Sequence, residues 1–112
     1  MDGKPKRQDK NRNPIKKLSP TEIDMMNEDW HNTDATTGLH QLIQQGNYEL
    51  VRDALASDAR LAHIRSEDGR GPMFWAHEYG RAKIVKLLKA YGVSESLKDA
   101  NQKSPLDTSA LV

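Results

Sequence analysis

The segment DGRGPMFWAHEYGRAKIVKLL, residues 68–88, carries the clearest structural signals in this 112-residue chain. Pro72 suits the first turn of a helix, because its missing N–H would have no intrahelical partner there. Gly80 permits a tight connection with a positive φ angle. Beyond Gly80, apolar side chains recur on one helical face as far as Tyr91. We therefore predict one helix that opens at Pro72 and is closed by Gly80, and a second over about 82–91.

The same pattern recurs on both sides of this segment. Gly46 stands 34 residues before Gly80, and Pro105 stands 33 residues after Pro72. The further helices expected from this periodicity cover about residues 38–45, 48–56 and 105 onward. A period in the low thirties, built from two short antiparallel helices and a turn-rich link, is typical of a helical solenoid. The sequence therefore predicts an all-α fold.

These repeats resemble a known family. DGRGPMFWA (residues 68–76) resembles D-G-x-T-P-L-H-x-A, which opens an ankyrin repeat, and EYGRAKIVKLL (78–88) resembles the family's E-x-G-x-x-x-I-V-x-L-L. SPLD (104–107) looks like the start of the next repeat, and TGLH (37–40) resembles an earlier one. The resemblance covers about 32–112 and implies a short ankyrin-like helical solenoid of two and a half repeats.

The family's Thr and His tie down the loop that precedes each inner helix. The resemblance assigns that pair to Thr37 and His40 in the first repeat, whereas Gly71 and Phe74 stand in its place in the middle repeat. In the last repeat, Ser104 and Asp107 are expected to make a similar hydrogen bond. We expect Phe74 and the neighbouring Trp75 to pack in the core between repeats.

The resemblance also implies a function. Ankyrin repeats bind proteins through their turn tips and the exposed side of their inner helices, so we expect a non-catalytic protein–protein interaction module. It would act as an adaptor or as a small structural subunit of a larger assembly. The positions that correspond to the family's binding surface are Asp34, Thr36, Gln44, Gln45, Glu67, Asp68, Arg70, Glu78, Tyr79, Asn101 and Lys103.

A helix before the first repeat is predicted from its own signals. Ser19 suits the N-cap position, and Glu22 three residues later completes a capping box. Ile23, Met26 and Trp30 then form one narrow apolar stripe. We predict an amphipathic helix over about 19–31 that caps the first repeat. At the other end, Leu106, Leu111 and Val112 have no such cap, and a partner protein is the simplest cover.

Residues 1–18 are predicted to form a disordered basic arm. They carry seven bases and two acids, whereas residues 19–37 carry five acids and no base. The arm is too poor in apolar residues to offset its ordering entropy. It is open whether the arm contacts RNA phosphates, contacts an acidic protein, or contacts nothing. An RNA-associated accessory role in a ribonucleoprotein is therefore the alternative function. The residues concerned are Lys4, Lys6, Arg7, Lys10, Arg12, Lys16 and Lys17.

Composition excludes several classes of site. The chain has no cysteine, which excludes disulfides and thiol catalysis. Its four histidines fall in no metal-ligand spacing, and no phosphate-cradling glycine loop is present. No apolar run approaches the length needed to cross a bilayer. We expect no enzyme activity, no cofactor, no metal and no small-molecule substrate, and a cytoplasmic or nuclear location.

Overall fold

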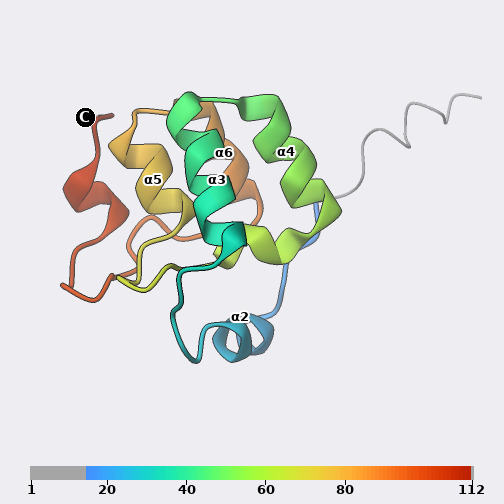
Figure 1. Ribbon diagram of the computed structural model, residues 1–112, viewed down its shortest axis with the longest axis vertical. Helices are drawn as coiled ribbons and strands as arrows, with labels where there is room; N and C mark the ends of the chain where they lie inside the picture. The colour runs from blue at the N-terminus through green and yellow to red at the C-terminus, as the bar shows by residue number, and fades with distance from the viewer. Residues whose placement is uncertain (1–14, 112) are drawn as a thin grey trace, which may run out of the picture.

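The computed structural model describes residues 15–111 (Figure 1). Within that range the regular structure is entirely helical, as the repeat pattern predicts. The α-helices are α2 (Pro20–Met26), α3 (Asp34–Gln45), α4 (Tyr48–Ser57), α5 (Pro72–Glu78) and α6 (Ala82–Ala90), and the 3-10 helices are η1 (Ala59–His63) and η2 (Pro105–Thr108). No helix in the described part of the chain is both long and apolar enough to cross a membrane.

The helices pack as two rows. The inner row is α3, α5 and η2, each packed against the next, and the outer row is α4 packed against α6. Each inner helix also packs against the outer helix that follows it in the chain, α3 against α4 and α5 against α6 (Figure 1). The third repeat contributes only η2 to these rows. This arrangement is the two-and-a-half-repeat solenoid that the sequence predicts.

The core lies between the two rows. Ile43, Leu55, Phe74 and Leu88 are fully buried there, and Trp75 is only 5% exposed. They come from α3, α4, α5 and α6, whose apolar residues recur at helical spacing and therefore face one another. The prediction that Phe74 and Trp75 belong to the core is confirmed.

Two glycines end the inner helices as predicted. Gly46 and Gly80 have φ angles of 73° and 67°, a conformation that favours glycine because it has no Cβ. The guanidinium of Arg81, which follows Gly80, donates hydrogen bonds to the carbonyls of Ile43 and Gln44 at the end of α3. A cation is favourable at that position because the last carbonyls of a helix lack intrahelical partners. Arg81 therefore links the first repeat to the second.

The predicted start of the first inner helix is wrong by one helical turn. α3 begins at Asp34, with Thr33 as its N-cap, and not at residue 38. Thr33 and Thr36 form a capping box, in which each side chain accepts from the other's backbone N–H. These residues occupy the place that the resemblance assigned to Thr37 and His40, which lie within the helix instead. The capping hydrogen bonds decide the register.

The third repeat also differs from the prediction. Pro105 opens a single 3-10 turn rather than an α-helix. The predicted bond between Ser104 and Asp107 is confirmed, because the Ser104 backbone N–H donates to the Asp107 carboxylate over 2.8 Å. The hydrogen bonds to Ser104 hold the pKa of Asp107 below its usual value. The element of the third repeat that packs against α5 is therefore η2, a short 3-10 turn held by its capping box.

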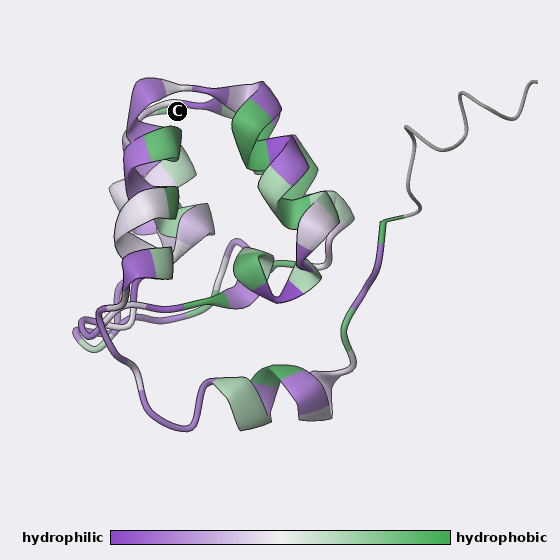
Figure 2. Ribbon diagram, turned by 45° about the vertical axis from the view of Figure 1, so that its right-hand side comes forward, coloured by the Kyte–Doolittle hydropathy of each residue, from purple (hydrophilic) through white to green (hydrophobic). Residues whose placement is uncertain are grey.

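The helix α2 has the predicted capping box between Ser19 and Glu22, but it ends at Met26 and does not reach residue 31. It lies beneath η1 and the connecting turns, crosswise to the long helices above (Figures 1 and 2). Ile23 of α2 lines a hollow of about 60 Å³ together with residues of the second repeat, including Pro72 and Val93. Glu22 of α2 also lines a hollow with Leu55 of α4, so α2 lies beside residues of both repeats.

Three turns, which we call fingers, stack side by side below the helices. They cover residues 27–33, 65–71 and 98–104. The first two are joined by Asn32 and Glu67, whose side chains and backbone exchange hydrogen bonds of 2.9 and 3.2 Å. The second and third are joined by the Ala100 N–H, which donates to the Asp68 carbonyl over 2.9 Å. The stacked fingers therefore set the spacing of the repeats below the helices. Core packing sets the same spacing between the helices themselves.

The aromatic ring of Trp30 belongs to this stack and not to α2. Its face lies 4.4 Å from the Arg65 guanidinium carbon, an arrangement that favours a cation. The ring also lies directly over Gly69, where a Cβ would clash with it. Trp30 therefore packs against the second finger, and Gly69 makes room for it.

A buried histidine holds the C-terminal segment. His77 on α5 lies 2.7 Å from the Ser109 hydroxyl and 2.7 Å from the Glu95 carboxylate, through its two ring nitrogens. The Ala110 N–H donates to the His77 carbonyl over 2.8 Å. Burial would raise the pKa of Glu95, but its hydrogen bonds with His77 and Lys89 outweigh that effect and lower it. These bonds attach residues 109–110 to the second repeat.

A second buried histidine, His63, lies in an environment that disfavours its protonation. His63 is 8% exposed, and within residues 15–111 its Nε2 atom has no hydrogen-bond partner. Burial lowers the pKa of His63 from 6.5, and a hydrogen bond with the backbone of Tyr91 only partly opposes this. The unfolded chain therefore takes up a proton at a higher pH than the folded chain does.

Above about pH 6.5 we expect the titration of His63 to leave the free energy of unfolding unchanged. Below that pH we expect it to lower the free energy of unfolding, because the unfolded chain takes up the proton first. The slope from one such proton cannot exceed about 1.4 kcal/mol per pH unit. Urea unfolding of the natural chain and of His63→Gln, compared at several pH values from neutral to mildly acidic, isolates this contribution. Parallel pH profiles for the two proteins would contradict the expectation.

Candidate functional site

The inner helices and the fingers border an open hollow on one side of the solenoid, which we call the groove. Its hollow measures about 240 Å³. One wall is α3, the opposite wall is the second finger, and the floor is α5. The lining residues are Asn32, Thr36, Thr37, His40, Ser66, Asp68 and Trp75. Polar groups therefore surround a buried aromatic floor.

The floor of the groove is held rigidly by three rings. The His40 ring meets Trp75 edge to face, with the centroids 5.0 Å apart and the planes at 89°. The Tyr79 hydroxyl lies 3.1 Å from His40 Nε2, and the two rings are 5.5 Å apart. Edge-to-face packing of this kind fixes ring orientation in addition to burying area. These contacts therefore hold the rings at the floor of the groove in defined orientations.

The second finger supplies the acidic rim of the groove. Asp68 accepts hydrogen bonds from the Ser66 hydroxyl over 2.7 Å and from the Arg70 N–H over 3.0 Å. One carboxylate oxygen makes both bonds, and the side chain remains exposed. The turn thus presents a negative charge in a fixed position beside Trp75.

Arg70 holds the finger in place instead of pointing into the groove. Its guanidinium lies 3.5 Å from the Glu78 carboxylate and 3.6 Å from that of Asp99, and its face lies over the Phe74 ring at 5.4 Å. The side chain is 22% exposed. A substitution of Arg70 would therefore disturb α5 and the third finger together.

The structure brings only two of the predicted binding residues into this groove, Thr36 and Asp68. Thr36 is 4% exposed because its hydroxyl is used in the α3 capping box. Tyr79 is half-buried, and its hydroxyl contacts the His40 ring. The remaining predicted residues with exposed side chains are Asp34, Gln44, Gln45, Glu67, Glu78, Asn101 and Lys103.

Five lining residues were not predicted as binding residues: Asn32, Thr37, His40, Ser66 and Trp75. Thr37 and His40 were predicted to tie down the loop at the start of the inner helix, because the first repeat was placed one turn too late. Trp75 was predicted as core, and it is buried while forming the floor of the groove. Asn32 and Ser66 reach the groove only because two fingers stack, and no local pattern signals this.

Of the predicted basic contacts, Lys16 and Lys17 are described, and both are exposed. Lys16 lines a separate hollow of about 210 Å³ with Asp58 and Tyr91, at the end of α6. The other five, Lys4, Lys6, Arg7, Lys10 and Arg12, lie outside the described residues. Among residues 15–111, no group of three or more His, Asp or Glu side chains is placed to hold a metal ion.

Comparison with known proteins agrees with the geometry. A family model described as ankyrin repeats, in three copies, matches residues 8–111. No curated protein and no solved structure gives a match. The match spans most of the chain and includes the segments that carry α2, the two complete repeats and the third finger with η2.

Proposed function

The chain belongs to the ankyrin-repeat family, and from that premise we propose that it binds a partner protein in the groove between α3, α5 and the second finger. Ankyrin repeats generally mediate protein–protein interaction. The observation that supports the groove is its rigid floor of Trp75, His40 and Tyr79 beside a fixed Asp68 carboxylate. A preorganised aromatic floor with a polar rim suits the tight packing of one partner side chain.

We propose further that the protein is a small non-catalytic subunit of a larger assembly rather than a free adaptor. Leu106 is 51% exposed, and Leu111 is also exposed at the same end of the solenoid. Exposed apolar side chains beside η2 favour a further protein surface there. The adaptor role remains the alternative, in which only the groove is occupied.

RNA association is retained as a second proposal, supported by the exposed Lys16 and Lys17 and the bases that precede them in sequence. Lysines neutralise phosphates without demanding a particular geometry. A cytoplasmic or nuclear location is proposed on the same basis. High salt distinguishes the two functions, because phosphate contacts weaken steeply with salt whereas a packed groove does not.

The groove is tested by Thr37→Arg. Thr37 is exposed on α3 and lines the hollow, so an arginine there fills space that a partner needs without removing a core contact. We expect at least about a tenfold loss of affinity for a groove partner, equal to about 1.4 kcal/mol. The measurement is affinity capture from source-cell lysate with nuclease and high salt, followed by titration of the captured protein.

The matched control is Thr21→Arg, which makes the same chemical change at an exposed position on α2. Proteins captured by the natural chain and by Thr21→Arg, but lost with Thr37→Arg, are groove partners. Equal capture by all three proteins would contradict the proposal. Loss of capture after nuclease treatment alone would favour the RNA proposal instead.

A further inference from the structure

The groove is bordered by acids and lies in a part of the chain that is poor in cations. Residues 27–45, which form the first finger and α3, contain no lysine or arginine. Their acids are Glu28, Asp29 and Asp34, and all three are exposed. The second finger adds the exposed Glu67 and Asp68. A side chain that enters the groove therefore meets a negative potential.

The two arginines of the second finger do not neutralise this potential. Arg65 donates its guanidinium hydrogen bonds to backbone carbonyls. Arg70 lies within ion-pair distance of Glu78 and Asp99. Within residues 15–111 neither arginine pairs with Asp68. The charge of the Asp68 carboxylate is therefore not balanced by its own finger.

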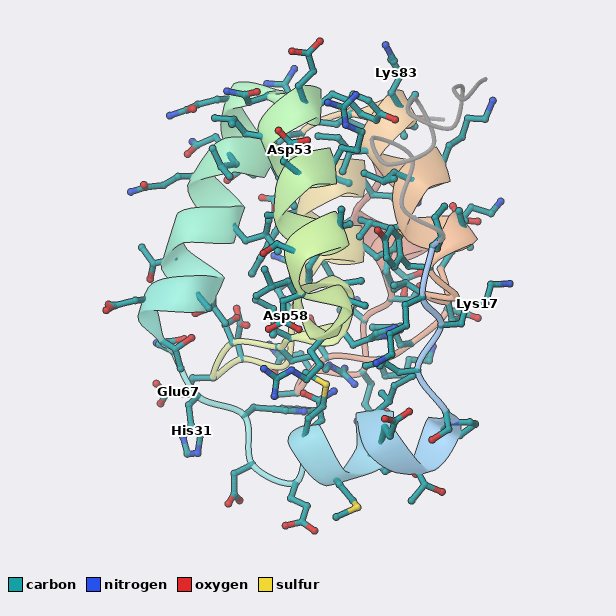
Figure 3. The ribbon with its side chains drawn as sticks, turned by 90° about the vertical axis from the view of Figure 1, so that its right-hand side faces the viewer. Lys17, His31, Asp53, Asp58, Glu67 and Lys83 are labelled. Atoms are coloured by element: carbon teal, nitrogen blue, oxygen red, sulfur yellow. The ribbon has the colours of Figure 1, made fainter. Side chains whose placement is uncertain are left out.

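Figure 3 shows that charge is separated across the molecule. Glu67 and His31, from the second and first fingers, lie toward one edge below α3, whereas Lys17 and Lys83 lie toward the opposite edge. The third finger carries the exposed lysines at positions 98 and 103. The negative region is therefore confined to α3 and the first two fingers, which are the parts that border the groove.

One oxygen of Asp68 is left for a ligand. Its Oδ1 atom accepts both hydrogen bonds that hold the turn, from the Ser66 hydroxyl and from the Arg70 N–H. The Oδ2 atom makes no hydrogen bond or ion pair within residues 15–111. Hydrogen bonds between a carboxylate and an ammonium or guanidinium group are shorter and stronger than neutral ones. Asp68 therefore suits a cationic donor.

Trp75 provides a hydrogen-bond donor on the floor of the same groove. The side chain is only 5% exposed. Its indole N–H has no acceptor within residues 15–111, and the nitrogen is still open to solvent. Because Trp75 lines the groove, this N–H is open to its hollow. A buried indole N–H ordinarily has a hydrogen-bond partner, so the floor suits a ligand that brings an acceptor.

A basic amino-acid residue satisfies both groups. Its charged side chain donates to Asp68, and a carbonyl of its own backbone accepts from the indole of Trp75. The apolar stem of an arginine or lysine can pack on the aromatic floor while the charged head stays at the polar rim. An acidic side chain would be repelled by Asp68. An apolar one would leave both polar groups without partners, which costs affinity.

We propose that the groove recognises a basic segment of its partner protein and seats one arginine or lysine side chain between Asp68 and Trp75. This inference rests on the proposed function, because it names the chemistry of the partner at that groove. It does not depend on the RNA proposal.

The test is a titration of the full nitrogen-15-labelled chain with the peptide acetyl-Gly-Arg-Gly-amide, followed by NMR. The signal observed is the indole N–H of Trp75. The chain has two tryptophans, and Trp75→Phe or Trp30→Phe assigns their two signals. The matched ligand contains citrulline in place of arginine, which keeps the shape and removes the charge. A salt concentration of about 0.15 M screens charges more than about 8 Å away.

The protein variant is Asp68→Asn, which keeps the oxygen that accepts from Ser66 and the Arg70 N–H. The matched control is Asp24→Asn, which removes the same charge from an exposed position on α2. Thermal unfolding of both variants verifies that the fold is retained.

We expect the arginine peptide to shift the Trp75 signal saturably and the citrulline peptide to bind roughly three- to fivefold more weakly. Asp68→Asn is expected to weaken binding of the arginine peptide by the same factor and to leave binding of the citrulline peptide within about twofold, because the two changes remove one interaction. Asp24→Asn is expected to change neither affinity by more than about 1.5-fold.

Several results would overturn the inference. These are equal affinities for the arginine and citrulline peptides, equal weakening by the two aspartate variants, and the absence of a saturable Trp75 shift. Tighter binding of acetyl-Gly-Glu-Gly-amide than of the arginine peptide would also overturn it, in favour of an acidic partner.

Lysate capture separates this inference from the proposed function. If Thr37→Arg loses a captured protein but Asp68→Asn binds it with the natural affinity, the groove binds that protein without recognising a basic side chain, and only the present inference fails. If Thr37→Arg keeps every captured protein, the proposed function itself fails, whatever the peptides show.

Discussion

Replacing Phe74 by Ala is expected to lower the free energy of unfolding by about 3–5 kcal/mol. Phe74 is fully buried on α5, so its removal loses transfer free energy and leaves a cavity that neighbouring helices only partly close. A domain of this size has a total stability of about 5–15 kcal/mol. The loss therefore takes away a large share of the stability.

Guanidinium unfolding, followed by far-UV circular dichroism, measures this effect in the full chain. The control is Leu106→Ala, because Leu106 is also an apolar residue of an inner element but is half exposed. We expect that change to alter the unfolding free energy by no more than about 0.5 kcal/mol. A loss of less than about 1 kcal/mol for Phe74→Ala would contradict the packing described for α5.

Restoring the family's threonine at Gly71 is expected to destabilise the protein by about 2–3 kcal/mol. A threonine N-cap ordinarily adds at most a small stabilisation over glycine. Here a Cβ on Gly71 would overlap the carbonyl oxygen of Ile64. That oxygen belongs to the backbone, so the clash is relieved only by moving the chain that enters the second finger.

The comparison for Gly71→Thr is Gly38→Ala, which is expected to have the opposite sign. Gly38 lies inside α3, and a Cβ there would meet nothing within 4 Å. Alanine in a helix interior is more stable than glycine by about 0.5–1 kcal/mol. Chemical denaturation of the two variants beside the natural chain checks both signs at once. Stabilisation by Gly71→Thr would show that the chain entering the finger has room to move.

The family resemblance explains why the predicted first repeat begins one turn late. TGLH at residues 37–40 has the Thr and His of the family's opening at the right spacing, but in the structure it lies inside α3. The structure accommodates Gly38 without any special backbone angle. The true start is set by the reciprocal hydrogen bonds between Thr33 and Thr36. Because Thr33 and Thr37 are both suitable N-cap residues, the sequence is compatible with a helix start after either one.

Interactions between residues close in sequence were predictable. Gly46 and Gly80 end the inner helices with positive φ angles, and Ser19 and Ser104 cap the elements that follow them. Each of these features depends on hydrogen bonds or backbone angles within a few residues, which the residue types reveal directly. The same holds for the helical spacing of the core residues, which placed α4, α5 and α6 nearly at their observed bounds.

The groove could be predicted only in outline. Family resemblance indicated the inner helices and turn tips, and Asp68 and Thr36 do line the hollow. The remaining lining depends on how the repeats stack. Arg70 and Tyr79, predicted from their positions in the family's binding surface, instead hold Asp99, Glu78 and His40 in place.

The sequence by itself determined the helical repeats, their capping residues, the apolar core and the uneven distribution of charge along the chain. Only the tertiary structure decided that α2 lies beside residues of both repeats, that Trp30 packs on Gly69, and that Lys16 and Lys17 lie on the same edge as α6. The physical reason is distance along the chain. Local signals come from neighbouring residues, whereas these contacts join residues roughly 40 to 75 positions apart and arise only when the repeats stack.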